Sequence, residues 1–289
     1  MKRWKILPEE EGLSLLLFLK AKLNLSNRNL KSILESNCCT VNGRVERFGS
    51  SYIVASDIVL IDMPETMASA TFPSSSAVSI LYEDHNYVCI DKPAGIASDD
   101  SILIKGREKL LLVHRLDKGT SGVLAFAKDQ NSCEALEQLF RTRKVKKHYL
   151  AIVMGTPDKD YGRVDNFLAK IKSYQGQSIW GAVPENLHGS LRAVTDWHVL
   201  KRGKGCALME CFPMTGRTHQ IRVHMSGMGC PVVGDVQYGV KKIFYPSKRP
   251  LLHAAELSFE HPKTEKQILV KAPLPEDFQR ALVALGLGK

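Results

Sequence analysis

The chain has 289 residues, of which 44% are hydrophobic and 24% are charged, and its 40 Lys and Arg outnumber 30 Asp and Glu. This composition is typical of a globular protein with a large core. No apolar stretch approaches the ~20 residues of a membrane span, which excludes an integral helical membrane protein. The formal charge of +10 favours a polyanionic partner such as nucleic acid.

The seven cysteines are scattered through apolar stretches without a repeating spacing. This pattern predicts reduced, buried thiols and a cytoplasmic protein. A zinc site built from Cys206, Cys211, His219 and His224 is disfavoured, because neither pair has the short spacing of zinc knuckles. The basic N-terminus is interrupted by glutamates before a short apolar run, so no secretory signal is expected. We predict no metal ion and no membrane association.

The beginning of the chain has two helical patterns. Leucines near helical spacing predict a short amphipathic helix over residues 12–23. Ser26 is suited to cap a second helix over residues 27–35, which has apolar residues on one side and basic residues on another. Two short helices are therefore expected in close succession.

A hairpin is expected next. Asn42 and Gly43 stand between β-prone pairs, and both positions of such a two-residue turn need positive φ, which these residues tolerate. Residues 52–54 and 58–61 are β-prone and are expected to complete a small sheet.

Two short helices followed by a tight hairpin resemble the alpha-L RNA-binding module of the ribosomal protein S-four type, over about residues 12–62. The sequence departs from that module at Ser56-Asp57, where the family usually has Gly-Asp. The resemblance implies RNA contacts by Lys20, Arg28, Lys31 and Arg44. The alternative is a small adaptor with merely solvated charges, because residues 1–62 carry nine Lys and Arg against seven Asp and Glu.

The following segment, residues 63–78, is rich in small polar residues and lacks periodicity, which predicts a linker between a domain at 1–62 and one at 79–289. Beyond it the chain is rich in predicted strands, with a helix between the last two of them. The strands are expected at residues 80–82, 87–90, 122–127 and 149–154. This mixture predicts an α+β fold with a mixed, largely antiparallel sheet, beside a small N-terminal α/β domain.

The most specific local pattern is His-Arg-Leu-Asp at 114–117, followed by Lys-Gly-Thr-Ser-Gly at 118–122 and a predicted buried strand. Gly, Thr and Ser after an acid predict a tight loop that holds the Asp117 carboxylate still. Asp117 could instead simply pair with Arg115 or Lys118. A degenerate kinase catalytic loop is disfavoured by the extra leucine and by the lack of a Gly-rich phosphate loop.

This pattern resembles the catalytic loop of the RluA-type (RluA, RluC, RluD) pseudouridine synthases. Further blocks match that family in the same order: Asp-Lys-Pro-Ala-Gly at 91–95, Lys-His-Tyr-Leu-Ala at 147–151, Thr-Gly-Arg-Thr-His-Gln-Ile-Arg-Val-His at 215–224 and Leu-His-Ala at 252–254. The resemblance implies a pseudouridine synthase fold and the isomerisation of uridine to pseudouridine in structured RNA, without a cofactor.

With the N-terminal module, the resemblance is to bacterial members that modify large-subunit ribosomal RNA, so this RNA is the expected partner of a monomeric enzyme. A tRNA substrate is the alternative within the same enzyme class. A noncatalytic RNA-binding factor for ribosome assembly is the alternative outside it, although such a factor would not need to retain an acid in a tight loop.

By the resemblance, the catalytic residues are Asp117, Tyr149 and Arg222. A carboxylate can attack the anomeric carbon or remove the ribose 2′ proton, and the sequence leaves both open. Arg222 would pair with Asp117, unless it is a strand arginine on a solvated face. Tyr149 would stack on the extruded base and could take the proton from carbon 5, unless it is a core aromatic that shares a face with Ala151 and Val153.

The family's arginine two residues before the acid corresponds to Arg115, which would fill the gap left when the uridine is flipped out. A dense basic run at 141–147 precedes Tyr149 and predicts phosphate contacts there, rather than only a solvated face. The expected RNA contacts of this domain are His114, Arg115, Thr120, Arg141, Arg143, Lys144, Lys147, Arg217 and His219.

Overall fold

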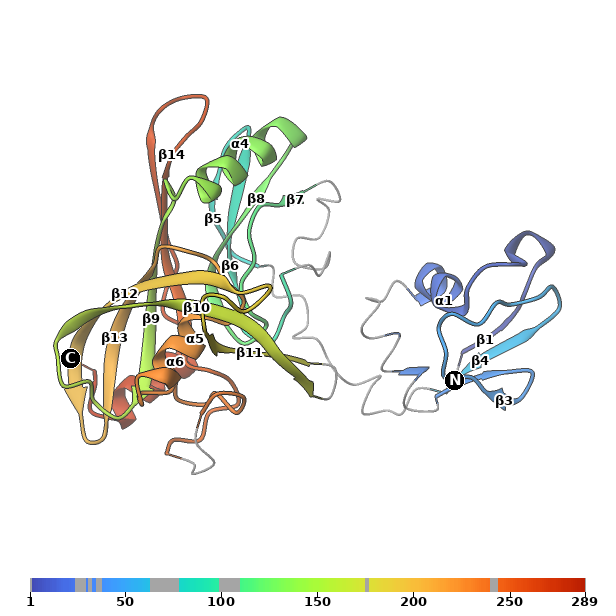
Figure 1. Ribbon diagram of the computed structural model, residues 1–289. Helices are drawn as coiled ribbons and strands as arrows, with labels where there is room; N and C mark the ends of the chain where they lie inside the picture. The colour runs from blue at the N-terminus through green and yellow to red at the C-terminus, as the bar shows by residue number, and fades with distance from the viewer. Residues whose placement is uncertain are drawn as a thin grey trace. The chain divides into compact units, whose positions relative to one another are not determined.

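The computed structural model of the protein describes residues 2–23, 30, 33–34, 38–62, 78–98, 110–174, 177–239 and 244–288. The chain divides into two compact units, Met1–Ser76 and Ala77–Lys289 (Figure 1). The division falls within the segment expected to be a linker, residues 63–78, of which the structure describes only residue 78.

The smaller unit contains a four-stranded antiparallel sheet in the order β1-β4-β2-β3. Its elements are β1 (Lys2–Lys5), the 3-10 helix η1 (Pro8–Glu10), α1 (Leu15–Leu23), β2 (Cys39–Val41), β3 (Arg44–Val45) and β4 (Ile58–Ile61). The first predicted helix is confirmed, but it begins only at Leu15. Gly12 adopts a φ of +80°, which is incompatible with a right-handed helix.

The predicted hairpin turn is confirmed. Asn42 and Gly43 have φ values of 52° and 78° and join β2 to β3. The Asn42 amide also links the turn to β4, since it donates to Asp57 Oδ1 at 2.7 Å and accepts from the Ile58 N–H at 2.9 Å. Ser56, which stands where the resembled module usually has glycine, keeps a left-handed φ of 73°.

Two other expectations for this unit have different outcomes. The strand predicted at residues 52–54 is wrong, because Tyr52 forms only an isolated bridge with Ser14. The second predicted helix, residues 27–35, lies mostly outside the described residues, as do Ser26, Arg28 and Lys31. The three described residues of that segment, Leu30, Ile33 and Leu34, are buried in the core of the smaller unit.

The larger unit is built on an eleven-stranded sheet, whose path runs β11-β10-β12-β13-β9-β14-β8-β6-β5, with β15 paired to β14 and β7 paired to β8. The strands are β5 (Ile80–Glu83), β6 (Tyr87–Lys92), β7 (Leu111–Leu112), β8 (Ser121–Ala127), β9 (Lys146–Met154), β10 (Tyr161–Tyr174), β11 (Gln177–Val183), β12 (Leu191–Gly203), β13 (Cys206–Pro213), β14 (Leu252–Glu260) and β15 (Gln267–Lys271). The predicted α+β class and largely antiparallel sheet are confirmed.

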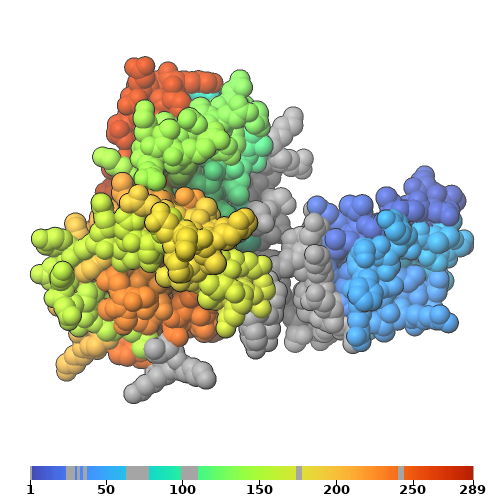
Figure 2. Space-filling view, viewed as in Figure 1, coloured from blue at the N-terminus to red at the C-terminus, as the bar shows by residue number. Residues whose placement is uncertain are grey.

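Among the described residues of this unit, three helices accompany the sheet: α4 (Gln130–Arg141), α5 (Gln220–Gly227) and α6 (Glu276–Ala284). The predicted helix corresponds to α4, which begins after Asp129 because that side chain accepts the Ser132 N–H at 2.8 Å. In α5, Ile221 and Met225 pack in one core cluster with buried residues of β9, β12 and β13. In Figure 2, the green segment that carries α4 lies on the visible face of the larger unit.

Strands β8 and β14 form the parallel pairing of the described sheet, through Ser121 and Gly122 opposite His253 and Ala254. The two backbones approach closely at Gly122, where an added Cβ would lie 2.1 Å from the Ala254 carbonyl oxygen. Gly122 also has a φ of +114°, so glycine is required for two independent reasons. This contact fixes the point at which the loop carrying Asp117 enters the sheet.

Candidate active site

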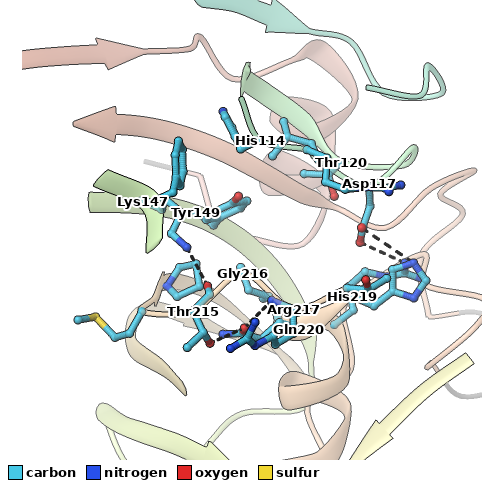
Figure 3. Close-up of a pocket in the computed structure, with 18 of the residues that line it drawn as sticks. His114, Asp117, Thr120, Lys147, Tyr149, Thr215, Gly216, Arg217, His219 and Gln220 are labelled. Carbon is cyan, nitrogen blue, oxygen red and sulfur yellow. Dashed lines mark hydrogen bonds and ion pairs between the residues drawn. The ribbon is translucent and has the colours of Figure 1, made fainter. Parts of the chain in front are cut away.

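A cavity of about 540 Å³ lies where the loop before β8, strand β9 and the segment leading into α5 meet (Figure 3). Its volume is in the range of small-molecule sites. It gathers most of the residues expected at the site: His114, Arg115, Asp117, Thr120, Arg141, Arg143, Lys147, Tyr149, Arg217, His219 and Arg222. These residues come from segments more than a hundred positions apart in the sequence.

The loop that carries Asp117 is fixed by contacts with the segment after β6. The Ser98 hydroxyl, which is buried, accepts from the Leu116 N–H at 2.9 Å and donates to the Leu116 carbonyl at 2.8 Å. The Gly95 N–H donates to the Lys118 carbonyl at 2.7 Å. These bonds flank Asp117 on both sides, so its backbone has little freedom.

A second clamp comes from the far end of the chain. The Arg249 guanidinium donates to the Gly119 carbonyl at 3.2 Å and forms a two-point ion pair with Asp277, at 2.6 and 2.8 Å.

The fully buried Lys92 donates to the carbonyls of Pro93 and Ile96. Burial, followed by the charge of Arg249, lowers the pKa of Lys92 to about 8.

Asp117 forms its ion pairs with groups on the opposite wall. Its Oδ2 lies 3.3 Å from Arg222 NH1, and its Oδ1 lies 3.9 Å from His219 Nε2. The Asp117 side chain is 24% exposed, which leaves it accessible from the cavity, whereas Arg222 is 8% exposed. Among the described residues, Asp117 forms no ion pair with the exposed Arg115 or Lys118, so that alternative is wrong.

Arg222 lies on α5, so the interpretation of it as a solvated strand residue is wrong. Its guanidinium is held by Asp235, through Nε–Oδ2 at 2.6 Å and NH2–Oδ1 at 2.9 Å, and by the side-chain Oε1 of Gln237 at 3.0 Å. It also lies over the Tyr238 ring, 4.9 Å from its centroid. Burial lowers the pKa of Arg222, but the hydrogen bonds and charge of Asp235 and Asp117 outweigh burial and raise it.

Sequence reasoning did not identify Asp235, Gln237 and Tyr238. The sequence signal for such a partner is Arg222 itself, because a buried guanidinium requires an acidic partner. The sequence offers many carboxylates, and only the folded chain selects Asp235 among them.

His219 is held in one tautomer by its hydrogen bonds. The Tyr238 hydroxyl accepts from the Trp180 N–H at 3.0 Å and shares a hydrogen bond of 2.7 Å with His219 Nδ1. The Asp117 carboxylate near Nε2 can only accept, which favours the tautomer in which the Tyr238 hydroxyl donates to Nδ1. The remaining ring proton then lies on Nε2, which faces Asp117. Burial lowers the pKa of His219 below its usual 6.5, and His219 therefore presents a neutral N–H to the carboxylate.

Tyr149 packs against the core and also lines the cavity. Its ring packs against the buried residues of two core clusters, with Ala151 and Val153 in one of them, and also lines the cavity. Burial, and then the charge of Asp117, raise the pKa of the Tyr149 phenol well above its ordinary value. The side chain is therefore a neutral ring with its proton in place at physiological pH.

Two of the predicted RNA-contacting residues, Lys147 and His114, line the cavity and form hydrogen bonds within the protein. Lys147 donates to the Thr215 carbonyl at 2.7 Å, and burial lowers its pKa to about 8. His114 stacks on Phe140 and accepts the Ala125 N–H at 3.0 Å, while burial lowers its pKa to about 3. His114 is thus uncharged and part of the loop's scaffold.

The remaining predicted contacts are distributed more widely. Arg115, Arg141 and Arg143 line the cavity, whereas the exposed Lys144 does not. Lys20 and Arg44 are exposed on the smaller unit, and Arg28 and Lys31 lie outside the described residues.

In the described parts of the chain, no group of three or more His, Cys, Asp or Glu side chains is arranged to hold a metal ion. No described helix is both long and apolar enough to cross a membrane.

Comparison with known proteins identifies the family. Residues 86–227 match the family model of RNA pseudouridylate synthase. The chain is 32% identical over 283 residues to ribosomal large subunit pseudouridine synthase D of Zymomonas mobilis, covering 88% of each chain. It is 35% identical over 221 residues to ribosomal large subunit pseudouridine synthase C of Buchnera aphidicola, covering 70% of this chain and 69% of that one.

A solved structure agrees. Human RNA pseudouridylate synthase domain containing 4 is 31% identical and superposes with a TM-score of 0.59, covering 72% of this chain and 93% of that one. The family-model match at residues 86–227 includes Asp117, Tyr149 and Arg222 of the cavity. The chain therefore belongs to the RluA-type RNA pseudouridine synthases and is an isomerase that acts on uridine in RNA.

Proposed function

We propose that Asp117 is the catalytic carboxylate and that the cavity around it receives a uridine flipped out of large-subunit ribosomal RNA. The observation that carries this proposal is the pairing of a partly exposed carboxylate with a buried arginine at the base of the cavity. The hydrogen bond from Arg222 holds the Asp117 carboxylate in one orientation while one face stays open to a ligand.

The reaction breaks the bond between uracil N1 and ribose C1′, turns the base and joins its carbon 5 to C1′. Carbon 5 loses its proton and the freed N1 gains one, so the product is an isomer of uridine. Asp117 can take part by attacking C1′ or by removing the ribose 2′ proton. Both routes require an ionised oxygen beside the sugar. Arg222 NH1, at 3.3 Å, holds one Asp117 oxygen in place.

Tyr149 is proposed as the platform for the flipped uracil. A phenol whose pKa is raised stays protonated and is a poor base, which favours stacking over proton removal from carbon 5. Detachment of the uracil from the sugar leaves it bound only by stacking and hydrogen bonds, so a rigid ring on β9 would keep it near C1′ while it turns.

The surrounding cations are proposed to position the RNA backbone. Arg141 and Arg143 line the cavity together with Arg217, and the phosphates on either side of a flipped nucleotide require such charges. Arg115 is exposed at the same cavity and suits the proposed filling of the gap in the base stack.

The smaller unit is proposed to be an RNA-binding module of the alpha-L type, with Lys20 and Arg44 among its contacts. Its support is the order of α1 and the β2–β3 hairpin and the left-handed turn at Ser56. We further propose that the enzyme acts as a monomer in the cytoplasm. Ribosomal RNA is favoured over tRNA because two of the relatives are named as large-subunit synthases.

The test is a map of pseudouridines in ribosomal RNA and tRNA from cells that lack the gene, complemented with the wild-type protein or with Asp117→Asn. Loss of a pseudouridine from large-subunit RNA, restored by the wild type only, is the expected result. Asn keeps the size of the side chain and removes the charge, so binding to the same RNA in a filter assay should persist.

Loss of a pseudouridine from tRNA instead would replace the proposed substrate while retaining the enzyme. Restoration of the site by Asp117→Asn would show that the catalytic residue is wrongly assigned.

A further inference from the structure

Asp235 pairs with the cavity residue Arg222 and is itself deeply buried, with a side chain only 1% exposed. A buried carboxylate is unfavourable unless it is paired and hydrogen-bonded. Here the pairing is complete, because Oδ2 accepts from Arg222 Nε, and Oδ1 accepts from Arg222 NH2 and from the N–H groups of Gln237 and Tyr238.

The geometry of the pair determines where the rest of the guanidinium points. Two parallel bonds from Nε and NH2 to one carboxylate fix the plane and rotation of the guanidinium. The second N–H of Arg222 NH2 donates to Gln237 Oε1, so NH1 is the part of the guanidinium that faces Asp117. Without Asp235, the same side chain could swing and lose that alignment.

Charge is the second consequence. The charged groups facing Arg222 are Asp117 and Asp235, while its other neighbours Gln237 and Tyr238 are neutral. Asp235 balances the arginine, so that Asp117 keeps a net negative charge next to a neutral His219 N–H. Without Asp235, the positive charge of Arg222 would be balanced by Asp117 alone, and the Asp117 carboxylate would be a weaker nucleophile or base toward the ribose.

We propose that Asp235 is a positioning residue of the isomerisation, acting through Arg222 to align and charge-balance the group that holds Asp117. This inference rests on the proposed role of Asp117 and concerns a residue that does not itself reach the substrate. Gln237 supports the same alignment more weakly, because it adds a hydrogen bond without a charge and ties the site to the Ser178 carbonyl of β11 at 3.0 Å.

The experiment uses the full chain in excess over a large-subunit RNA transcript made with [5-³H]uridine, because joining carbon 5 to the sugar releases the tritium. We expect Asp235→Asn to slow the single-turnover rate constant by about 100-fold, the scale of a misaligned catalytic group, with the RNA dissociation constant unchanged within about threefold. Gln237→Leu should slow it by about tenfold or less, since no charge is lost.

Two variants control for stability. Asp196→Asn breaks a similar two-point pair with Arg163, at 2.6 and 2.8 Å, away from the cavity. Val233→Ala removes buried volume close to Asp235 in sequence. Both should keep the wild-type rate constant, even where Val233→Ala lowers the melting temperature, because partial unfolding reduces the reacting fraction of the RNA and leaves the rate constant of folded enzyme unchanged.

A wild-type rate constant in Asp235→Asn would overturn the inference, as would a loss seen only in the reacting fraction. An equal loss in Gln237→Leu would refute the importance of the charge. The proposed function fails separately, if Asp117→Asn releases tritium as fast as the wild type or if the wild type releases none.

Discussion

The close approach of β8 and β14 leads to a quantitative prediction for Gly122→Ala. The new Cβ would lie 2.1 Å from the Ala254 carbonyl oxygen, whereas Cβ atoms essentially never approach closer than 3.0 Å. The obstacle is backbone and cannot rotate away, so the strands must separate where Ser121 and Gly122 pair with His253 and Ala254. Overpacking together with the positive φ should cost about 2–6 kcal/mol.

For a unit of this size, this cost corresponds to a fall in melting temperature of roughly 5–20 °C. The matched control is Gly95→Ala, because Gly95 has a similar φ of +91° but no atom within 4 Å of its added Cβ. Differential scanning calorimetry of the two variants separates the two costs: the backbone strain is common to both, and the collision is confined to Gly122→Ala.

The Gly122→Ala variant should also release tritium from labelled RNA more slowly, because β8 continues directly from the loop that carries Asp117. Equal melting temperatures for the two alanine variants would refute the reasoning, since the collision with Ala254 would then contribute nothing.

Other contacts of the loop give further predictions. Ser98→Ala removes both bonds to the Leu116 backbone and should cost about 1–3 kcal/mol in unfolding free energy, which urea denaturation would measure; an unchanged midpoint would contradict it. Burial lowers the pKa of His253 from 6.5 to about 4, so between these pH values the unfolded chain binds a proton that the folded chain does not. Stability should therefore fall by up to about 3 kcal/mol as pH drops through this window, less so in His253→Gln, and equal slopes would count against the buried neutral imidazole.

Local sequence patterns were sufficient where short-range sterics decide the structure. The Asn42-Gly43 turn follows from the positive φ that each residue tolerates, and α4 and the buried strand β8 follow from hydrophobic periodicity. The tight loop around Asp117 was also expected, because Gly, Thr and Ser favour such turns. These features depend on residues within a few positions of one another.

Local patterns gave wrong predictions where contacts with distant parts of the chain decide the backbone conformation. The β-prone residues at 52–54 form only one bridge, because Tyr52 meets Ser14 rather than a full strand partner. Arg222 was considered as a strand residue, yet it lies on a short helix that starts after the left-handed His219. Propensity is a weak prior at such positions, and tertiary packing overrides it.

The sequence by itself determined that an acid stands in a tight loop before a buried strand, and that cations and an aromatic ring follow in a recognisable order. Only the tertiary structure decided which groups surround that acid. Ser98, Arg249 and Asp235 are separated from their partners by 13 to 130 positions. Their pairing depends on strand register and on the burial of charge, two quantities that exist only once the sheet has formed.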